Sequence, residues 1–146
     1  MKTHQLSVFL ENRAGALRQP CQVLADAGVD ILTLSLADTK EFGILHLIVR
    51  DWEQAKNALE TAGKTVKVTE VVAVEVADEP GGLANVLRHI EEAAINVDYM
   101  YAFTFGNQGR AVLVFCFNDP DRAVLTLDEA GVKTIGMGEL YERTKS

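Results

Sequence analysis

The sequence contains few of the residues and patterns that mark specialised classes of protein. It has two cysteines, Cys21 and Cys116, far apart and each in an apolar stretch. We therefore expect two buried thiols in a reducing compartment rather than a disulfide. No apolar run approaches the roughly 18 residues that span a membrane, and the N-terminus meets charge after only a few apolar residues. These absences predict a cytoplasmic protein with no membrane partner.

Positive charge and catalytic patterns are also scarce. The formal net charge is −7, with acidic and basic residues interspersed, so nucleic acid is not expected as a partner. The three histidines, His4, His46 and His89, are scattered, without cysteine or carboxylate at ligand spacing. We therefore expect no metal and no other cofactor. Since no serine, cysteine or lysine lies in a nucleophile motif, the sequence predicts a protein that is not an enzyme.

The sequence does contain a long internal repeat. The stretch ENRAGAL (Glu11–Leu17) follows one apolar run, and ADEPGGL (Ala77–Leu83) follows another 66 residues later. A repeat of this length suits a duplicated small domain, and 146 residues are enough for two. We predict two domains, residues 1–70 and 71–146, packed together without a flexible linker.

The periodicity of apolar residues changes in the same order in both halves. Asp51 and Asp119 each stand where a helix N-cap is expected, and Pro120 takes the first helical position. The closing strand of the first half also opens the second. Each half reads as βαββαβ, which is a ferredoxin-like arrangement of four antiparallel strands with both helices on one face. The first half is predicted to contain strand Leu6–Leu10, helix Leu17–Gly28, strands Ile31–Leu36 and Ile44–Val49, helix Trp52–Gly63 and strand Thr65–Val76.

This fold supports many functions, so the function has to come from the residues. RNA recognition requires aromatic side chains on central strands in basic surroundings, but the second strand of the first half offers Leu, Thr and Ser and the net charge is negative. Soft-metal transport requires a loop of paired cysteines, which the sequence lacks. What remains is the glycine turn between strand and helix, which occurs twice. Such a turn places the unpaired N–H groups of a helix N-terminus where a carboxylate can bind, although most strand-to-helix turns bind nothing.

At this point the sequence resembles a known family. ENRAGAL and ADEPGGL, each followed about fifteen residues later by AGVDI or AAINV, resemble the ACT domain signature. The resemblance covers nearly the whole chain as two consecutive ACT domains. The stretches EFGILHLIVRD and VDYMYAF are similar to a stand-alone group of bacterial tandem ACT proteins. The family resemblance implies an α+β fold of two ferredoxin-like domains, paired side by side into an eight-stranded antiparallel sheet with the helices on one face. It also implies an allosteric, regulatory module that binds an amino acid at the seam between paired domains.

The resemblance also implies ligand contacts. In serine-sensing ACT domains an asparagine lies three residues before the signature glycine, and Asn12 matches it. A second asparagine comes from the facing domain, and its position is held by Asp30 in the first half and Asn96 in the second. The ligand histidine of those domains is replaced by Leu10 and Val76, so serine specificity is not assumed. The favoured seam therefore consists of Asn12, Arg13, Ala14, Gly15, Ala16, Leu17 and Asn96.

A second seam is weaker on electrostatic grounds. It would place two acidic side chains near a ligand carboxylate, and like charges at short range oppose binding. Phe42 and Gly43, in the turn before the third strand, are expected to reach a ligand side chain. For all these polar positions the alternative is a role in capping helices and turns. The second seam consists of Asp30, Asp78, Gly81, Gly82 and Leu83.

Aromatic side chains alternate in the second half at Tyr99, Tyr101, Phe103 and Phe105. In a strand they share one face of the sheet. If no helix covers that face, Tyr99, Tyr101 and Phe103 would form an interface with a ligand or a second subunit, which makes a homodimer plausible. The alternative is that a bulge turns some of them into the helix-packed core.

We therefore expect a non-catalytic regulatory protein that binds a free amino acid and reports its level. Ligand at a seam would stabilise one arrangement of domains or subunits, which an unidentified protein partner would read. The alternative is an assembly module that holds a partner enzyme and binds no small molecule.

Overall fold

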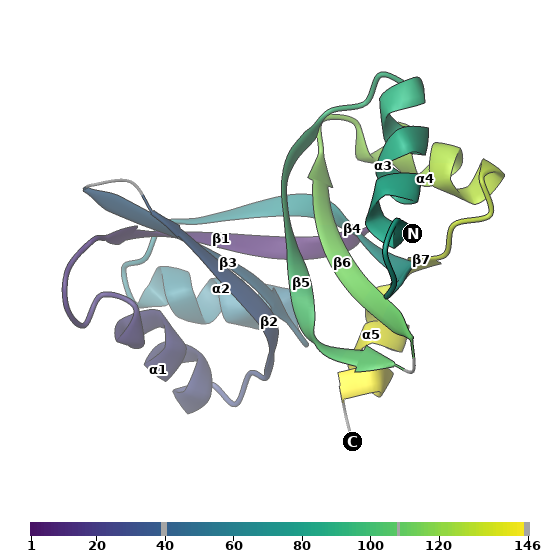
Figure 1. Ribbon diagram of the computed structural model, residues 1–146. Helices are drawn as coiled ribbons and strands as arrows, with labels where there is room; N and C mark the ends of the chain where they lie inside the picture. Colours follow the sequence, from purple (N-terminus) through teal and green to yellow (C-terminus); the bar gives the residue numbers. More distant parts are fainter. Residues whose placement is uncertain (39–40, 108, 145–146) are drawn as a thin grey trace. The chain divides into compact units, whose positions relative to one another are not determined.

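The computed structural model describes residues 1–38, 41–107 and 109–144 (Figure 1). The chain forms two compact units. The N-terminal unit is His4–Thr69, and the C-terminal unit combines Met1–Thr3 with the chain from Glu70 onward. Met1–Thr3, which the predicted division counts with the first half, thus lie in the unit built from the second half.

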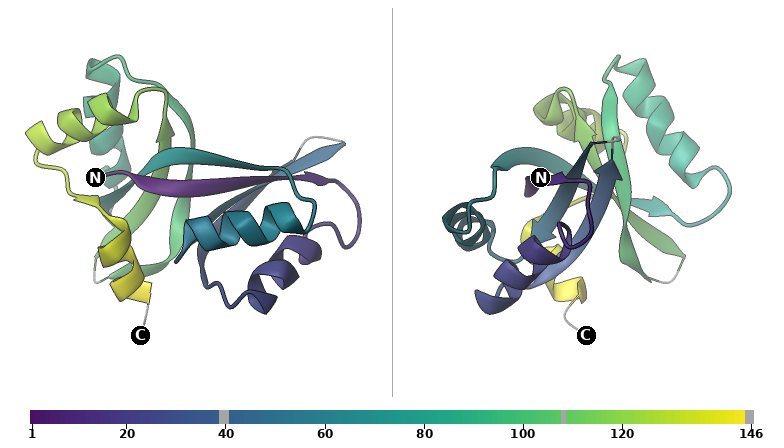
Figure 2. Two further views of the ribbon diagram at one scale, coloured as in Figure 1. Left: turned by 180° about the vertical axis from the view of Figure 1, so that it is seen from behind. Right: turned by 90° about the vertical axis from the view of Figure 1, so that its left-hand side faces the viewer.

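The N-terminal unit has the predicted βαββαβ order. Its strands lie in the order β2-β3-β1-β4. β1 is antiparallel to β3, with Leu6 opposite Leu47, and β2 is antiparallel to β3. Two helices lie side by side against this sheet (Figure 2, left). The elements are β1 (Thr3–Glu11), α1 (Arg18–Asp26), β2 (Ile31–Asp38), β3 (Phe42–Val49), α2 (Trp52–Thr61) and β4 (Val66–Ala77).

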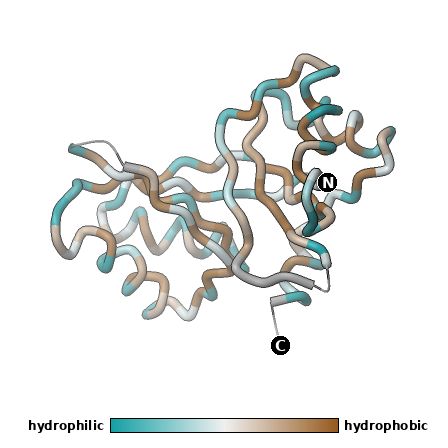
Figure 3. Tube along the Cα trace, in the orientation of Figure 1, coloured by the Kyte–Doolittle hydropathy of each residue, from teal (hydrophilic) through white to brown (hydrophobic). Residues whose placement is uncertain are grey.

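Alternation along the strands determines which sheet face the helices cover. Leu6, Val8 and Leu10 of β1 are buried in one cluster with Leu24 of α1 and Leu59 of α2. The residues between them on β1 point to the opposite face. Along the helices, hydrophobic and hydrophilic residues alternate turn by turn (Figure 3), as expected for helices that cover a core with one side.

The C-terminal unit repeats this plan. Its strands lie in the order β4-β6-β5, and β7 pairs with the same strand as β6, on β4. Val72, opposite Phe115, takes the place that Leu6, opposite Leu47, has in the N-terminal unit. The elements after β4 are α3 (Gly82–Glu92), β5 (Val97–Asn107), β6 (Arg110–Phe117), α4 (Pro120–Glu129), β7 (Thr134–Ile135) and α5 (Met137–Thr144).

The last helix, α5, corrects the expectation that all helices lie on one face. Glu75 lies between Val74 and Val76, whose side chains are in the core beneath α3 and α4, so its side chain is on the opposite face. Arg143 of α5 contacts the Glu75 carboxylate at 2.8 Å. α5 therefore packs against the face that α3 and α4 leave open, and it lies apart from them in Figure 1.

The count of strands differs from the prediction as well. The described residues contain seven strands instead of eight, because β4 is a single strand of 12 residues that closes one unit and opens the other. The predicted helix starts are confirmed. Asp51 accepts a hydrogen bond from Gln54 N–H and Asp119 accepts one from Arg122 N–H, both at 3.2 Å.

Candidate functional site

The two glycine turns have the same backbone geometry. Gly15 and Gly81 adopt φ of 86° and 87°, a left-handed conformation that favours glycine. The Ala16 N–H donates to Arg13 O at 3.2 Å, and the Gly82 N–H donates to Glu79 O at 3.0 Å. The repeat seen in the sequence is therefore a repeat of turn structure.

The helices that follow these turns begin without a side-chain cap. The N-cap residues of α1 and α3, Leu17 and Gly81, form no side-chain cap, whereas Asp51 caps α2 and Asp119 caps α4. The N-cap positions of these helices are Leu17 and Gly81, and neither Asn12 nor Asp78 occupies them. Both turns present helix N–H groups and the positive end of a helix dipole to an external group.

The first turn lies next to the start of β3. The Asn12 N–H donates to Glu41 O at 3.0 Å, and the strand register pairs Phe42 with Glu11. Three large apolar side chains here remain exposed, with Leu17, Leu36 and Phe42 at 39%, 48% and 57%. The turn also contains an ion pair, in which Arg13 Nε donates to the Glu11 carboxylate at 2.8 Å. The first turn thus combines a helix N-terminus with exposed apolar surface.

Gly43 lies one step further from the turn on β3. It is paired with Leu10 in the strand register. A Cβ placed on Gly43 would lie 3.4 Å from Leu36 Cδ1, so the backbone here runs close beside that exposed leucine. Gly43 thus lies between Leu36 of β2 and Leu10, two residues before Asn12.

The second turn is more tightly packed. The Asp78 N–H donates to Gly109 O at 2.8 Å. A Cβ on Gly82 would lie 2.0 Å from Ala77 O, so only glycine fits. A hollow of about 430 Å³ borders this turn, and its lining is mostly apolar apart from Asp78 and Glu79. Its lining residues are Val76, Ala77, Asp78, Glu79, Pro80, Leu83, Ala111 and Leu113.

The helix-end positions differ in their side-chain partners. Asp30 accepts a hydrogen bond through its backbone carbonyl from Arg50 N–H at 3.1 Å. Asn96 is held by Asn118, whose Oδ1 accepts from the Asn96 N–H at 2.9 Å. The Asn96 side chain donates from Nδ2 to Asp98 Oδ1 at 2.9 Å. Asp98 thus contacts the candidate position Asn96 directly, a contact that the sequence analysis did not anticipate.

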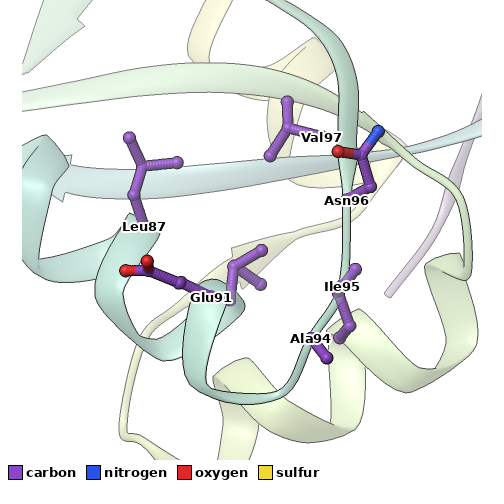
Figure 4. A pocket seen from close by; sticks show the side chains of 7 residues that line it. Leu87, Glu91, Ala94, Ile95, Asn96 and Val97 are labelled. Atoms are coloured by element: carbon purple, nitrogen blue, oxygen red, sulfur yellow. The ribbon is translucent and has the colours of Figure 1, made fainter.

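A hollow of about 380 Å³ lies beside Asn96. Figure 4 shows Leu87 and Glu91 of α3 on one side and Asn96 and Val97 on the other, with Ala94 in the connection between them. Ala94 is the one non-glycine residue with positive φ, at 56°, among the described residues. The lining is mostly apolar and consists of Leu87, Ile90, Glu91, Ala94, Ile95, Asn96 and Val97.

Neither unit alone brings a glycine turn together with a helix-end position. In the N-terminal unit the Asn12 turn lies at the end of the sheet where Glu11 pairs with Phe42, whereas Asp30 precedes Ile31, which pairs with Val49 at the other end of β3. Over eight residues of strand this separation is roughly 25 Å. The same holds for Asp78 and Asn96 in the C-terminal unit. Within each unit, therefore, the glycine turn and the helix-end position lie at opposite ends of the sheet.

The aromatic residues of β5 lie on the face away from α3 and α4. Tyr99 pairs with Cys116 and Tyr101 with Val114, whereas the core residue Met100 pairs with Phe115. Burial raises the pKa of the Tyr101 phenol far above its ordinary value, and Tyr99 and Cys116 add to this effect. Phe103 is buried, and the side chain of Phe105 lies outside those that the structure describes. Tyr99 and Tyr101 therefore lie outside the core that α3 and α4 cover.

The matching face of the N-terminal unit carries a hydrogen-bonded polar cluster. Ser7 Oγ lies 2.9 Å and Gln5 Nε2 3.1 Å from His46 Nδ1, and all three side chains are buried. Burial lowers the pKa of His46 below 6.5. His46 is thus a packed strand histidine.

The described residues contain no group of three or more His, Cys, Asp or Glu placed to hold a metal ion. Both cysteines are free thiols; Cys116 is buried and Cys21 half-buried. Within the same described ranges, no helix is long and apolar enough to cross a membrane.

The family model of the ACT domain pair matches residues 1–140. The chain belongs to the ACT domain pair family. ACT domain pairs are regulatory modules, and membership agrees with a regulatory role that involves a small ligand. The two units are accordingly called the first and second ACT domains below. No curated protein matches the chain.

Solved structures agree with this assignment. Protein BT0572 from Bacteroides thetaiotaomicron is 34% identical, with 97% of this chain and 96% of that chain covered and a TM-score of 0.90. The regulatory subunit of aspartate kinase from Thermus thermophilus, in its ligand-free form, is 13% identical over 87% of this chain and 91% of that chain, with a TM-score of 0.60. The regulatory subunit of aspartate kinase from Thermus flavus is 15% identical, covers the same shares and has a TM-score of 0.61. The two aspartate kinase subunits share the fold.

Proposed function

We propose that this ACT domain pair is a non-catalytic sensor that binds a free amino acid at a seam between its two domains. The seam would combine the turn from Asn12 to Leu17 with the helix end at Asn96. The observation that carries the proposal is that the N-cap residues of α1 and α3 form no side-chain cap, in contrast to those of α2 and α4. Both of these helices follow a glycine turn, and a ligand carboxylate is suited to a helix N-terminus of this kind.

Each half of this seam offers what the other lacks. The first domain supplies backbone N–H donors, which suit the α-carboxylate of an amino acid. The second domain supplies a hollow with the Asn96 amide at its rim, and an amide oxygen accepts from an ammonium group. Exposed Leu17, Leu36 and Phe42 are suited to contact the apolar part of a ligand.

The regulatory mechanism would be a shift between domain or subunit arrangements. A ligand that contacts both domains stabilises the arrangement in which the seam is closed, by as much as its affinities for the two arrangements differ. A homodimer or a separate protein partner would then respond to that arrangement. The half-buried side chains of Tyr99 and Tyr101 are our candidates for the subunit interface, whereas Phe103 is already buried within the single chain.

A thermal-shift screen of the twenty amino acids, followed by calorimetry of any hit, tests the proposal. A ligand at about 100 times its Kd should add roughly 2.7 kcal/mol to the free energy of unfolding. We expect Asn12→Ala and Asn96→Ala to abolish that shift. Asp78→Ala is the matched control at the second turn and should leave it unchanged.

The assembly-module alternative has one observation in its favour. On β2, which pairs with β3 in its domain, Leu34 and Leu36 are both large, apolar and exposed. Such a strand is suited to pair with another protein. If none of the twenty amino acids shifts the unfolding temperature and a specific enzyme co-purifies with the protein, the sensor proposal is wrong and this alternative replaces it.

A further inference from the structure

We infer that α5 is a latch that opens and closes on the folded second domain, and that the second glycine turn responds to its position through Glu75. The inference concerns a helix that lies outside the repeated βαββαβ plan. It goes beyond the proposed function and does not depend on it, since no amino acid takes part in the latch.

The helix α5 is attached to its domain at few points. It has eight residues, and a helix of this length has little stability of its own in water. Among its described side chains, only that of Leu140 is fully buried. Arg143 lies on the same side of the helix, three residues further on, and donates from Nη1 to Glu75 Oε1 at 2.8 Å. Docking therefore depends mainly on one apolar side chain and one ion pair.

The ion-pair partner, Glu75, is an acidic residue on the sheet face that carries the buried Ala73. The Glu75 N–H donates to Lys133 O at 3.0 Å. In the first domain the Phe9 N–H donates to Thr65 O at 3.2 Å, so Phe9 is the equivalent residue. Phe9 is 45% exposed, and both helices of its domain cover the other face. The fold therefore does not require a charge at this position, and Glu75 serves the docking of α5.

A carboxylate at this position makes docking reversible. With α5 docked, the side chains of Glu75 and Arg143 are only 11% and 18% exposed. Burial by itself raises the pKa of Glu75, but the hydrogen bond and charge of Arg143, with the charges of Arg110 and Lys133, outweigh it and lower that pKa overall. When α5 leaves, water solvates the carboxylate. The docked and open states are therefore closer in free energy than they would be with an apolar contact at this position.

The Glu75 carboxylate also connects α5 to the second glycine turn. Arg110 Nη2 lies 3.8 Å from Glu75 Oε2, a longer contact than the one with Arg143. Arg110 directly follows Gly109, whose carbonyl accepts a hydrogen bond from the Asp78 N–H at 2.8 Å. One carboxylate thus contacts an arginine of α5 and an arginine beside the turn.

The same two side chains border the turn itself. Glu75 and Arg110 line one hollow of about 360 Å³ together with Gly81 and Gly82. When Arg143 leaves, the charge of Glu75 acts chiefly on Arg110 and draws it closer. The backbone at Gly109 moves with Arg110, which loosens its hydrogen bond with the turn. Such coupling is reciprocal, so a change at the turn also shifts the position of α5.

Native-state hydrogen exchange of the full chain, followed by NMR at low urea concentrations, tests the inference. The amides of a latch exchange by local opening, whereas those of a central strand exchange by global unfolding. We expect the Leu140 amide and its neighbours in α5 to exchange about 100 times faster than those of Val114 and Phe115 in β6. Their exchange should not depend on urea, because local opening exposes little surface.

Two variants connect the latch to the turn. Arg143→Met should raise the exchange of the α5 amides about tenfold and that of the Asp78 and Gly82 amides about threefold, because a charge-assisted hydrogen bond is lost. Arg143→Lys keeps the charge and should restore most of the difference. Leu140→Ala opens the latch without removing a charge and should raise the exchange of the same amides. The β6 amides show in each case whether the domain remains folded.

Arg122→Met is the matched control. Arg122 is an exposed arginine of α4 in the same domain, and its loss should leave both sets of amides unchanged. Equal changes in this variant would assign the effect to the overall charge of the domain and overturn the role of Glu75.

Two further outcomes contradict the inference. If the α5 amides exchange as slowly as those of β6, α5 is a fixed part of the domain and no latch exists. If Arg143→Met and Leu140→Ala release α5 while the Asp78 and Gly82 amides keep their rates, the turn does not respond to it. Neither result affects the thermal-shift screen, so the proposed sensor stands or fails separately.

Discussion

In the first ACT domain the sheet face opposite the helices is polar, and in the second domain the matching face is apolar and aromatic. Gln5, Ser7 and His46 form the buried hydrogen-bonded cluster of the first domain. The strand registers place Val71, Ala73 and Val114 at the equivalent positions of the second. Neighbouring β2 carries Thr33 and Ser35 where β5 carries Tyr99 and Tyr101.

The helix-covered faces of the two domains are much more alike. Leu6 opposite Leu47 in the first domain corresponds to Val72 opposite Phe115 in the second, and all four side chains are fully buried. Packing against two helices restricts these positions to apolar residues. The comparison shows that the fold depends on one face of each sheet, which leaves the other face available for functions that differ between the domains.

The largest expected effect concerns the glycine turns. Gly82→Ala places a Cβ 2.0 Å from a backbone oxygen of Ala77, so the turn has to shift. We expect a loss of about 3 kcal/mol or more, at the upper end of overpacking effects. At the matching position the first domain accommodates Ala16, which is buried in its core. Urea unfolding followed by circular dichroism measures the loss.

Gly138→Ala is the control for that substitution. Gly138 is in α5, and a Cβ there would meet no atom within 4 Å. The change should be neutral or stabilising, because alanine has a helix propensity up to about 1 kcal/mol better than glycine. Equal losses for both variants would show that the second turn is not restricted to glycine by its close approach to Ala77.

An intermediate effect is expected from the polar face of the first domain. His46 is buried and its folded-state pKa is lowered below 6.5, so at acid pH the unfolded chain binds a proton more readily than the folded one. The stabilisation is complete above about pH 6.5 and is lost as the pH falls below that value. The single tryptophan, Trp52, is in the first domain, so its fluorescence reports the unfolding of that domain.

His46→Gln should remove this part of the pH dependence while it keeps a hydrogen-bonding side chain. We would compare the urea midpoints of the two proteins between pH 5 and pH 8. Parallel curves for both proteins would contradict the assignment to His46. The second domain has Val114 at this position, so its own hydrogen-exchange protection should not change with the variant.

The smallest expected effect distinguishes the two helix ends. Ala94 has a φ of 56°, whereas Gly28, its counterpart, has a φ of 71°. Since left-handed backbone is strained for alanine, Ala94→Gly should stabilise the protein by about 0.5–1 kcal/mol after the entropy cost of glycine. Gly28→Ala should destabilise by a similar amount, as measured by the same urea unfolding. A loss of stability in Ala94→Gly would mean that the alanine methyl group contributes more than the strain costs.

The sequence was sufficient for the βαββαβ order of the two halves and for the starts of α2 and α4. Apolar periodicity placed the strands and helices, and Asp51 and Asp119 predicted the caps that are observed. α5 was missed, although Met137, Leu140 and Tyr141 have helical spacing. A segment of eight residues is too short for this pattern to distinguish it from a loop.

The candidate site was only partly readable from the sequence. The turns at Gly15 and Gly81 followed from local backbone requirements, which sequence patterns capture well. The contact between Asp98 and Asn96 was missed because it is a side-chain hydrogen bond, which sequence patterns do not reveal. The sequence indicated that one continuous strand closes the first half and opens the second. Counting that strand once gives seven strands, whereas the family resemblance implied eight.

The placement of the first three residues has a consequence for folding during synthesis. Lys2 forms ion pairs with Glu70 at 2.9 Å and Asp121 at 2.7 Å, in the second domain. A ribosome adds roughly 5–20 residues per second, so several seconds separate the synthesis of Lys2 from that of Asp121. The first domain is contiguous from His4 to Thr69 and is ready to fold in that interval. Lys2 is thus synthesised before the first domain but completes its ion pairs only after most of the second domain has been made.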